Sequence, residues 1–262
     1  MAQQRAMADG GILVLRNEDL DGARCKPEFV SSMFEDLHWF GLEWQEGPDC
    51  GGPFGPYSQS ERRETYRTAF EKLRHGGFIY PCVCSRQDVL RAVQAPHEGE
   101  DEPVYPGTCR PREGEKASVS HEVDSGSSTR TNWRFRLPDG EVITFVDEHY
   151  GPQHFMAGKD FGDFVVWRHD NIPAYQLAVV VDDAAMQITE VVRGEDLLLS
   201  TARQLLLYRA LQLTPPKYYH CPLVTDESGS RLAKRHDALS LRALRIGGTD
   251  PDTLRRAWHV PR

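Results

Sequence analysis

The chain lacks any apolar run long enough to cross a lipid bilayer. Such a run needs about 18 consecutive apolar residues, and no stretch of this sequence approaches that length. The first residues, MAQQRAMADGG, also lack the apolar core of a secretory signal peptide. We therefore expect a cytoplasmic protein with no membrane partner. The sequence also lacks an internal repeat.

Composition places the chain among ordinary globular proteins. Its 262 residues fit one large domain, or one domain with a small insertion; 39% are hydrophobic and 27% are charged. A net charge of −8 argues against a general nucleic-acid coat. Positive charge is nevertheless concentrated in residues 191–262, which hold 12 Lys and Arg against 7 Asp and Glu. That basic third suits a phosphate-bearing ligand, although a solvated helical face explains the count equally well.

Six cysteines are present, and in a cytosolic chain we expect thiols or metal ligands and not disulfides. Cys25, Cys50 and Cys221 stand alone in the sequence, where packing or surface filling is the default role. The other three occur closer together and suit a shared metal ion.

Cys82, Cys84 and Cys109 resemble part of a zinc knuckle. Two thiolates one residue apart can share a tetrahedral ion, and structural zinc takes four ligands in all. The candidates for a fourth ligand are His97, Tyr105, His121 or a carboxylate. The alternative is a pair of partly buried thiols beside a loop, because C-x-C is less specific than paired C-x-x-C motifs.

The most ordered pattern covers residues 174–211. Residues 177–181 and 188–192 are short apolar, β-branched runs bounded by polar residues, which predicts two buried strands. The polar turn Arg193-Gly194-Glu195-Asp196 follows the second run, and an apolar helical pattern then covers residues 197–211. Because α/β proteins place ligand chemistry at such strand-to-helix turns, this turn is a candidate site.

The remaining patterns predict a mixed α/β chain with loops over residues 94–130. Strands are expected at residues 11–16, 78–83, 163–168 and 218–224, and helices at 27–40, 60–73 and 239–260, the last one broken at Gly247-Gly248. Residues 133–137 and 141–146 alternate around Pro138-Asp139-Gly140, which predicts a hairpin.

Two charged segments are candidate ligand sites. The acidic segment Asn17-Glu18-Asp19-Leu20-Asp21 follows an expected strand, and its carboxylates repel one another unless a cation, an arginine or a ligand ammonium shares them. The basic loop Arg231-Leu232-Ala233-Lys234-Arg235 suits a triphosphate or a pyrophosphate leaving group. Each segment also fits a solvated surface turn.

Taken together, these segments resemble the catalytic domain of class I glutamyl-tRNA synthetases. The resemblance covers nearly the whole chain, and the motifs occur in the family's order and at suitable distances. The matching segments are EDLD, SQSERRETY, YPCVCS, YPGTC, AYQLAVVVDD, VVRGEDLL, RQLLLYRAL and RLAKR. The resemblance implies a Rossmann-like α/β core with a small zinc-binding insertion.

Two features make the chain more similar to a stand-alone paralogue family, the glutamyl-Q tRNA(Asp) synthetases. Only 27 residues follow RLAKR, so we expect no anticodon-binding domain. The C-x-C and Y-x-x-x-C pattern also matches the paralogues, and implies Cys82, Cys84, Tyr105 and Cys109 as ligands of a structural Zn²⁺ ion. Tyrosine oxygen is an uncommon ligand, so the residues alone do not select it over histidine.

The resemblance also implies an activity. Family members activate glutamate with ATP, for which we expect Mg²⁺, and transfer it to the queuosine base in the anticodon of tRNA(Asp); we expect a monomer. Glu18 is implied to hold the α-ammonium of glutamate, with Tyr175 and Arg193 completing the amino-acid pocket. An arginine suits this place because its fork can bind both oxygens of a side-chain carboxylate. Lys234 matches the second lysine of the KMSKS-type loop and is implied to neutralise ATP phosphates.

The resemblance further implies four consecutive parts of the chain. Residues 1–80 and 131–225 correspond to the two parts of the Rossmann-like core, residues 81–130 to the zinc-binding insertion with its loop, and residues 226–262 to the KMSKS-like loop with a helical tail.

The sequence departs from the family in three places. Arg231 and Ala233 replace the usual lysine and serine of the KMSKS-type loop, and Asn17 stands where an isoleucine usually precedes the glutamate. Family members also carry a first strand, an RFAPSPTG-like segment and a HIGH-type motif well before EDLD, whereas 17 residues precede Glu18 here and none matches. We therefore expect an N-terminally truncated chain, through a misplaced start codon or gene decay, with much of its ATP site and its rate lost. The rival hypotheses are a fragment of a glutamyl-tRNA synthetase and a catalytically dead glutamate- or tRNA-binding module.

Overall fold

The computed structural model describes residues 1–22, 25–92, 104–112, 130–223 and 240–257. The chain divides into two compact units. Unit 1 comprises Met1–Arg62, Glu190–Asp196 and Tyr219–Arg262, and unit 2 comprises Arg63–Thr189 and Leu197–Tyr218. The chain therefore leaves each unit and returns to it.

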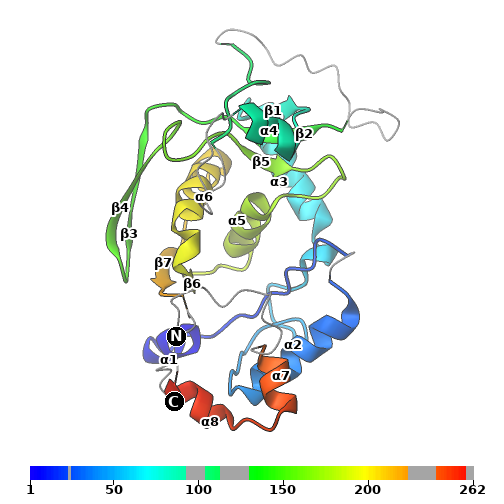
Figure 1. Ribbon diagram of the computed structural model, residues 1–262, viewed down its shortest axis with the longest axis vertical. Coiled ribbons are helices and arrows are strands. Elements are labelled where there is room, and N and C mark those ends of the chain that lie inside the picture. The colour runs from blue at the N-terminus through cyan, green and yellow to red at the C-terminus, as the bar shows by residue number, and fades with distance from the viewer. Residues whose placement is uncertain (23–24, 93–103, 113–129, 224–239, 258–262) are drawn as a thin grey trace. The chain divides into compact units, whose positions relative to one another are not determined.

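Helices and strands are mixed along the chain, as Figure 1 shows. The helices are α1 (Ala2–Ala8), α2 (Pro27–Trp39), η1 (Gln59–Glu61), α3 (Arg63–His75), α4 (Arg86–Ala92), α5 (Tyr175–Ala185), η2 (Glu195–Leu197), α6 (Leu198–Leu211), α7 (Leu241–Ile246) and α8 (Pro251–Ala257). The strands are β1 (Ile79–Cys82), β2 (Asn132–Phe135), β3 (Val142–Asp147), β4 (Gly151–Met156), β5 (Phe164–Trp167), β6 (Glu190–Gly194) and β7 (Lys217–Cys221). Among the described residues, no helix has both the length and the apolarity to span a membrane.

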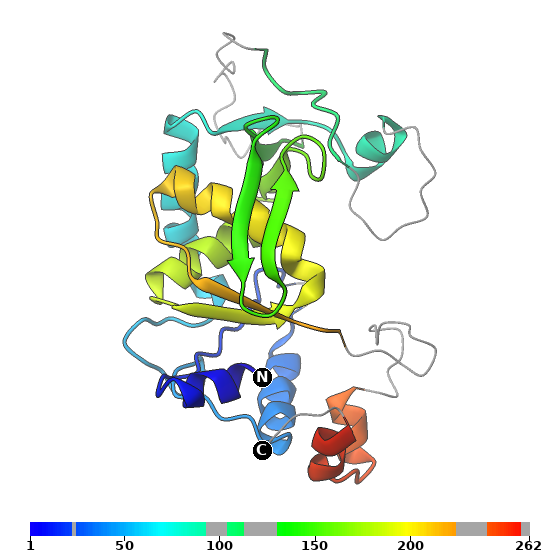
Figure 2. The same ribbon diagram turned by 90° about the vertical axis from the view of Figure 1, so that its left-hand side faces the viewer.

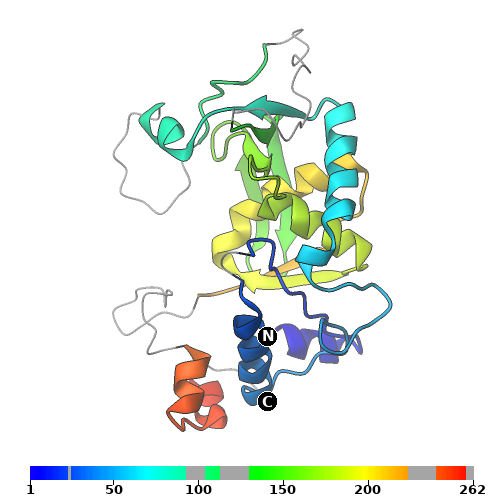
Figure 3. The ribbon, with the colours of Figure 1, turned by 90° about the vertical axis from the view of Figure 1, so that its right-hand side faces the viewer.

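Helix α5 is the centre of unit 2. Every residue from 177 to 183 is buried, and the helix packs against α3, α6 and β5 (Figure 3). The strand predicted for residues 177–181 is therefore wrong. A five-residue apolar run is typical of a buried strand and equally of a helix covered on all sides, so the run alone does not distinguish them.

A buried hydrogen bond ties α3 to α5. Tyr66 Oη lies 3.0 and 2.9 Å from the two carboxylate oxygens of Asp182, and both residues are 0% exposed. A carboxylate removed from water needs such a donor, because an unsatisfied buried charge is costly. The pair therefore fixes the register between the two helices.

The strands β1, β2 and β5 form an antiparallel sheet in the order β1-β2-β5. Phe70 of α3 packs on it, with ring centroids 5.3 Å from Trp133 and 5.0 Å from Trp167. Edge-to-face and tilted pairs at these distances contribute beyond their buried area. The sheet carries Cys82 at the end of β1.

The hairpin predicted between residues 133–137 and 141–146 is wrong. β2 pairs with β1 and β5, whereas β3 pairs antiparallel with β4 in a hairpin that contacts α6 through β3 (Figure 2). Leu137 explains the failure, because its N–H donates to Asp163 Oδ1 at 2.8 Å and its carbonyl accepts from Arg110 Nη2 at 2.6 Å. These side chains occupy backbone groups that a β2–β3 ladder would need.

The sequence patterns do not predict strand β4. It begins with Gly151-Pro152, which is typical of a loop, and it lies at an edge of its sheet, where proline is tolerated. The turn before it is made by Asp147, whose Oδ1 accepts from the backbone N–H of His149 at 3.0 Å and of Tyr150 at 2.9 Å.

Unit 1 contains α1, α2, α7 and α8, with β6 as the neighbour of β7. Helices α2 and α7 are joined by Arg245, which lies 2.9 Å from Glu35 and 2.7 Å from Asp36. The helix predicted at residues 27–40 and the helical tail broken at Gly247-Gly248 are confirmed by α2, α7 and α8.

Residues 11–16 do not form the predicted strand. They take part in a single isolated bridge, which pairs Val14 with Glu46. The N–H of Leu13 donates to the side-chain oxygen of Gln45 at 2.8 Å, so a side chain replaces a backbone partner and no continuous ladder forms.

Replacing Tyr66 by phenylalanine should lower the free energy of unfolding by about 1–3 kcal/mol, because the Asp182 carboxylate loses a buried donor. Asp182→Asn keeps an acceptor for the hydroxyl and should cost less. Denaturant titrations of the two variants and the wild type measure the difference. An unchanged stability for Tyr66→Phe would contradict the assigned role of this bond.

Candidate functional site

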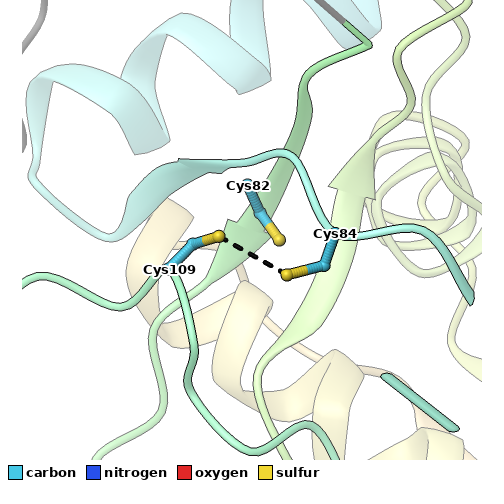
Figure 4. Close-up of side chains that lie close together, drawn as sticks. All are labelled: Cys82, Cys84 and Cys109. Carbon is cyan, nitrogen blue, oxygen red and sulfur yellow. Dashed lines mark hydrogen bonds between the residues drawn. The ribbon is translucent and has the colours of Figure 1, made fainter. Parts of the chain in front are cut away.

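Three thiols of unit 2 converge at the end of β1 (Figure 4). The sulfurs of Cys82, Cys84 and Cys109 all lie within 4.8 Å of one another, and those of Cys84 and Cys109 are 3.5 Å apart. A tetrahedral zinc ion with bonds of about 2.3 Å separates its sulfur ligands by roughly 3.8 Å. The spacing of the thiols therefore suits one shared ion.

Tyr105 supplies a fourth donor beside the thiols. Its hydroxyl oxygen lies 3.4 Å from Cys82 Sγ and 3.7 Å from Cys84 Sγ, and it accepts from the backbone N–H of Cys109 at 2.8 Å. Tyr105 and Cys82 are both buried, in one cluster with Tyr80. Of the four ligand candidates weighed from the spacing, His97 and His121 lie outside the described residues, whereas Tyr105 is in contact with the thiols.

The surroundings of the cluster shift the pKa values of its groups in different directions. Burial raises the pKa of the Cys84 thiol to about 11. Burial, followed by the hydrogen bond to Cys82, raises the pKa of Tyr105 well above its usual range. Burial also acts to raise the pKa of Cys109, but hydrogen bonds from the Val83 backbone and from Tyr105 outweigh it and lower that pKa. A bound dication favours the deprotonated form of each of these groups.

Arg134 is a buried cation against this cluster, and the sequence patterns did not point to it. Its Nε donates to Cys82 Sγ at 3.3 Å, its Cζ lies 3.9 Å above the Tyr105 ring, and Nη1 donates to the Asp163 carbonyl at 2.8 Å. Arg134 is only 8% exposed. Three thiolates, one phenolate and Zn²⁺ carry a net charge of −2, so a buried guanidinium fits a metal-loaded cluster.

A cavity of about 660 Å³ lies next to the cluster in unit 2, and Tyr105 forms part of its wall. Three of its charged side chains bind one another: Arg110 lies 2.7 Å from Asp139 and 3.6 Å from Asp163. The buried Asp163 also accepts from Tyr80 at 2.6 Å. The mutual pairing of these three groups stabilises the wall.

Glu18 lies in unit 1 with its side chain 43% exposed, and Arg16 Nη2 contacts it at 3.1 Å. The neighbouring Asp19 accepts from the backbone N–H of Ser60 at 2.9 Å and from its hydroxyl at 2.7 Å. The acidic segment therefore divides its carboxylates between different partners. An arginine, one of the three kinds of partner expected from the sequence, is among them.

Arg193 lies on β6 in unit 1 and is half-buried. Its Nε donates to Nε2 of His220 on β7 at 3.1 Å, and His220 is 0% exposed. His220 could not be predicted from the sequence, since the tyrosines and the histidine of YYHC show no functional pattern. Only the pairing of β6 with β7 brings the two residues together.

Tyr175 is the first residue of α5 in unit 2 and is 39% exposed. The next residue, Gln176, donates to Ser200 Oγ at 3.0 Å and accepts from Gln204 Nε2 at 2.9 Å. These contacts fasten the first turn of α5 to α6. Because Glu18 and Arg193 belong to the other unit, a common pocket for the three residues stays a prediction.

The basic loop of Arg231, Leu232, Ala233, Lys234 and Arg235 lies outside the described residues.

The family model of class I tRNA synthetases (E and Q), catalytic domain, matches residues 1–257 of the chain. The chain therefore belongs to this family of ligases. The expected α/β class is confirmed at the level of the synthetase catalytic domain.

Within the family, the chain is similar to two relatives named glutamyl-Q tRNA(Asp) synthetase. The one from Symbiobacterium thermophilum is 49% identical over 255 residues, which cover 97% of this chain and 77% of the relative. The one from Nitratidesulfovibrio vulgaris is 46% identical over 248 residues, which cover 95% and 75%. A crystal structure of the glutamate-tRNA synthetase from Elizabethkingia anophelis matches with a TM-score of 0.73 at 29% identity, over 91% of this chain and 49% of that one. The resemblance seen in the motifs is confirmed.

Proposed function

We propose that the chain activates L-glutamate with ATP and transfers it to the queuosine base of tRNA(Asp). The observation that supports this most is the identity of 49% to a glutamyl-Q tRNA(Asp) synthetase over 97% of the chain. In the first step the α-carboxylate of glutamate bonds to the α-phosphorus of ATP, and pyrophosphate leaves. In the second step a nucleophile of the queuosine base attacks the activated carbonyl carbon, and AMP leaves.

In this proposal Arg193 binds the side-chain carboxylate of glutamate, Glu18 binds the α-ammonium and Tyr175 lines the pocket. The charges suit the ligand, since a guanidinium matches a carboxylate and a carboxylate matches an ammonium. The partial burial of Arg193 and its bond to His220 support the first role, because a held guanidinium loses less freedom when it binds. The exposure of Glu18 leaves its carboxylate accessible to a ligand.

The basic loop would act on the phosphates. Lys234, flanked by Arg231, Leu232, Ala233 and Arg235, would neutralise pyrophosphate as negative charge develops on it, and Mg²⁺ would accompany ATP as part of the substrate. Arg231 preserves the positive charge of the lysine that is usual at its position. We propose that the protein acts as a monomer.

Pyrophosphate exchange with glutamate, in the absence of tRNA, tests the activation step. We expect exchange by the wild type, and a loss of roughly 10²–10³-fold in Lys234→Ala because a phosphate contact that strengthens in the transition state is removed. If the wild type exchanges pyrophosphate no faster than Lys234→Ala but still binds glutamate in calorimetry, the result would support a binding module instead.

Transfer assays test the acceptor. Radiolabelled glutamate should be transferred to tRNA(Asp) that bears queuosine and not to the same tRNA lacking it. Charging of tRNA(Glu) at its 3′ end would contradict the queuosine specificity and support the activity of a glutamyl-tRNA synthetase fragment.

We also propose that Cys82, Cys84, Tyr105 and Cys109 hold a structural Zn²⁺ ion. The separations of the thiols, the hydroxyl beside them and the buried Arg134 support the proposal. When bound, the ion would join residues on both sides of the segment that follows α4. It takes no part in the proposed reaction.

Metal analysis of purified protein should give one zinc ion per chain, and Cys82→Ser with Cys84→Ser should lose it because two of the four ligands are gone. Cys25→Ser with Cys221→Ser is the matched control, since neither thiol belongs to the cluster. Stoichiometric zinc in the first variant would refute the site.

Replacing Arg134 by methionine should weaken zinc binding about 10- to 100-fold, as for other contacts that support a metal ligand. Arg136→Met removes the same charge from the same segment. Among the described residues, the arginine side chain that donates to a cysteine of the cluster is that of Arg134. The zinc affinity of Arg136→Met should therefore equal that of the wild type. Competition with a chromophoric chelator measures each affinity. Equal affinities in the two variants would show that Arg134 does not support the ligands.

A further inference from the structure

We infer that His220 is a positioning residue for Arg193: it orients the guanidinium toward the amino-acid ligand without adding negative charge beside it. The inference rests on the proposed function, in which Arg193 binds the side-chain carboxylate of glutamate. It also gives a reason why the proposed pocket would prefer an amino acid with an anionic side chain.

The direction of the hydrogen bond fixes the chemical state of the histidine. Arginine Nε is only a donor, so Nε2 of His220, 3.1 Å away, must accept. An imidazole that accepts at Nε2 is neutral and carries its proton on Nδ1. His220 is 0% exposed, so the acceptor is held by the packing around it and is not replaced by water.

This bond also constrains the other nitrogens of Arg193. The guanidinium is planar and its donors have a fixed angular relation, so holding the Nε–H bond direction sets the direction of the Nη pair. Two parallel N–H groups are what a carboxylate binds in its bidentate geometry. A side chain already held in this orientation has less freedom to lose on binding.

The charge of the partner at Nε matters because a carboxylate there would neutralise the guanidinium, as carboxylates do at two other arginines of the chain. Arg5 contacts Glu190 at 2.6 Å and Arg209 contacts Glu141 at 2.6 Å. In those pairs the partner itself neutralises the guanidinium. The partner at Nε of Arg193 is a neutral ring, and it contributes a fixed direction with no opposing charge. A carboxylate at position 220 would compete directly with a carboxylate ligand.

Three variants separate orientation from packing. His220→Gln places an amide oxygen near the position of Nε2 and keeps an acceptor. His220→Leu keeps apolar bulk without an acceptor, and His220→Glu adds the competing charge. His154→Leu is the matched control, because His154 is an exposed histidine on β4 in the other unit.

Calorimetric titration with L-glutamate and the KM values of pyrophosphate exchange measure the effect. We expect His220→Leu to weaken glutamate binding and raise the KM for glutamate about 10- to 100-fold, the cost of losing a hydrogen bond to a charged group. The KM for ATP should not change, His220→Gln should restore most of the affinity, and His220→Glu should lose more than His220→Leu. A merely structural role would lower both affinities together, and glutamine would not rescue glutamate binding.

If the wild type binds glutamate and His220→Leu binds it with the same affinity, the inference is wrong and the proposed function stands. Wild-type protein that does not bind glutamate overturns both. A further measurement does not depend on a variant at position 220. Nitrogen-15 NMR spectra of histidine-labelled protein report the protonation of each imidazole, and the signal of His220 is the one that changes in Arg193→Lys. A neutral ring protonated at Nδ1 supports the inference, whereas a cationic ring or the other tautomer overturns it.

Discussion

The burial of α5 on every side is the constraint on which unit 2 depends. A helix whose residues from 177 to 183 all lie out of water has no polar face, so α3, α6 and β5 must cover it. The buried carboxylate of Asp182 then requires the hydroxyl of Tyr66 on α3. Helix α3 also places Phe70 against the sheet of β1, β2 and β5, and the edge strand β1 of that sheet carries Cys82.

Elements with a clear period could be predicted from the sequence, and elements decided by tertiary partners could not. The apolar spacing of α2 and the Gly247-Gly248 break required no other part of the chain. The run 177–181 is too short to show a helical period, so only its neighbours identify α5 as a helix. The partner of β2 was missed because Asp163 and Arg110, distant in sequence, bind the backbone of Leu137.

The same distinction applies to the candidate sites. The spacing of Cys82, Cys84 and Cys109 indicated a metal site, but tyrosine as the fourth ligand came only from the resemblance. Arg134 and His220 were missed, since their partners lie 52 and 27 residues away. The two arginines in these contacts differ in the charge of their partners. Arg134 lies beside groups that would be negatively charged when zinc is bound, whereas Nε of Arg193 contacts a neutral ring.

The division of the chain has a consequence for the order of folding during synthesis. Both segments of unit 2 have been made once residue 218 is complete, so that unit can close around α5 early. Unit 1 needs a third segment that begins at Tyr219, and Arg245 reaches its partner Glu35 across 210 residues. Contacts of such sequence separation form slowly. Residues 1–62 are therefore made first, but the unit to which they belong is completed last. Until then, α2 lacks α7, the helix against which it packs.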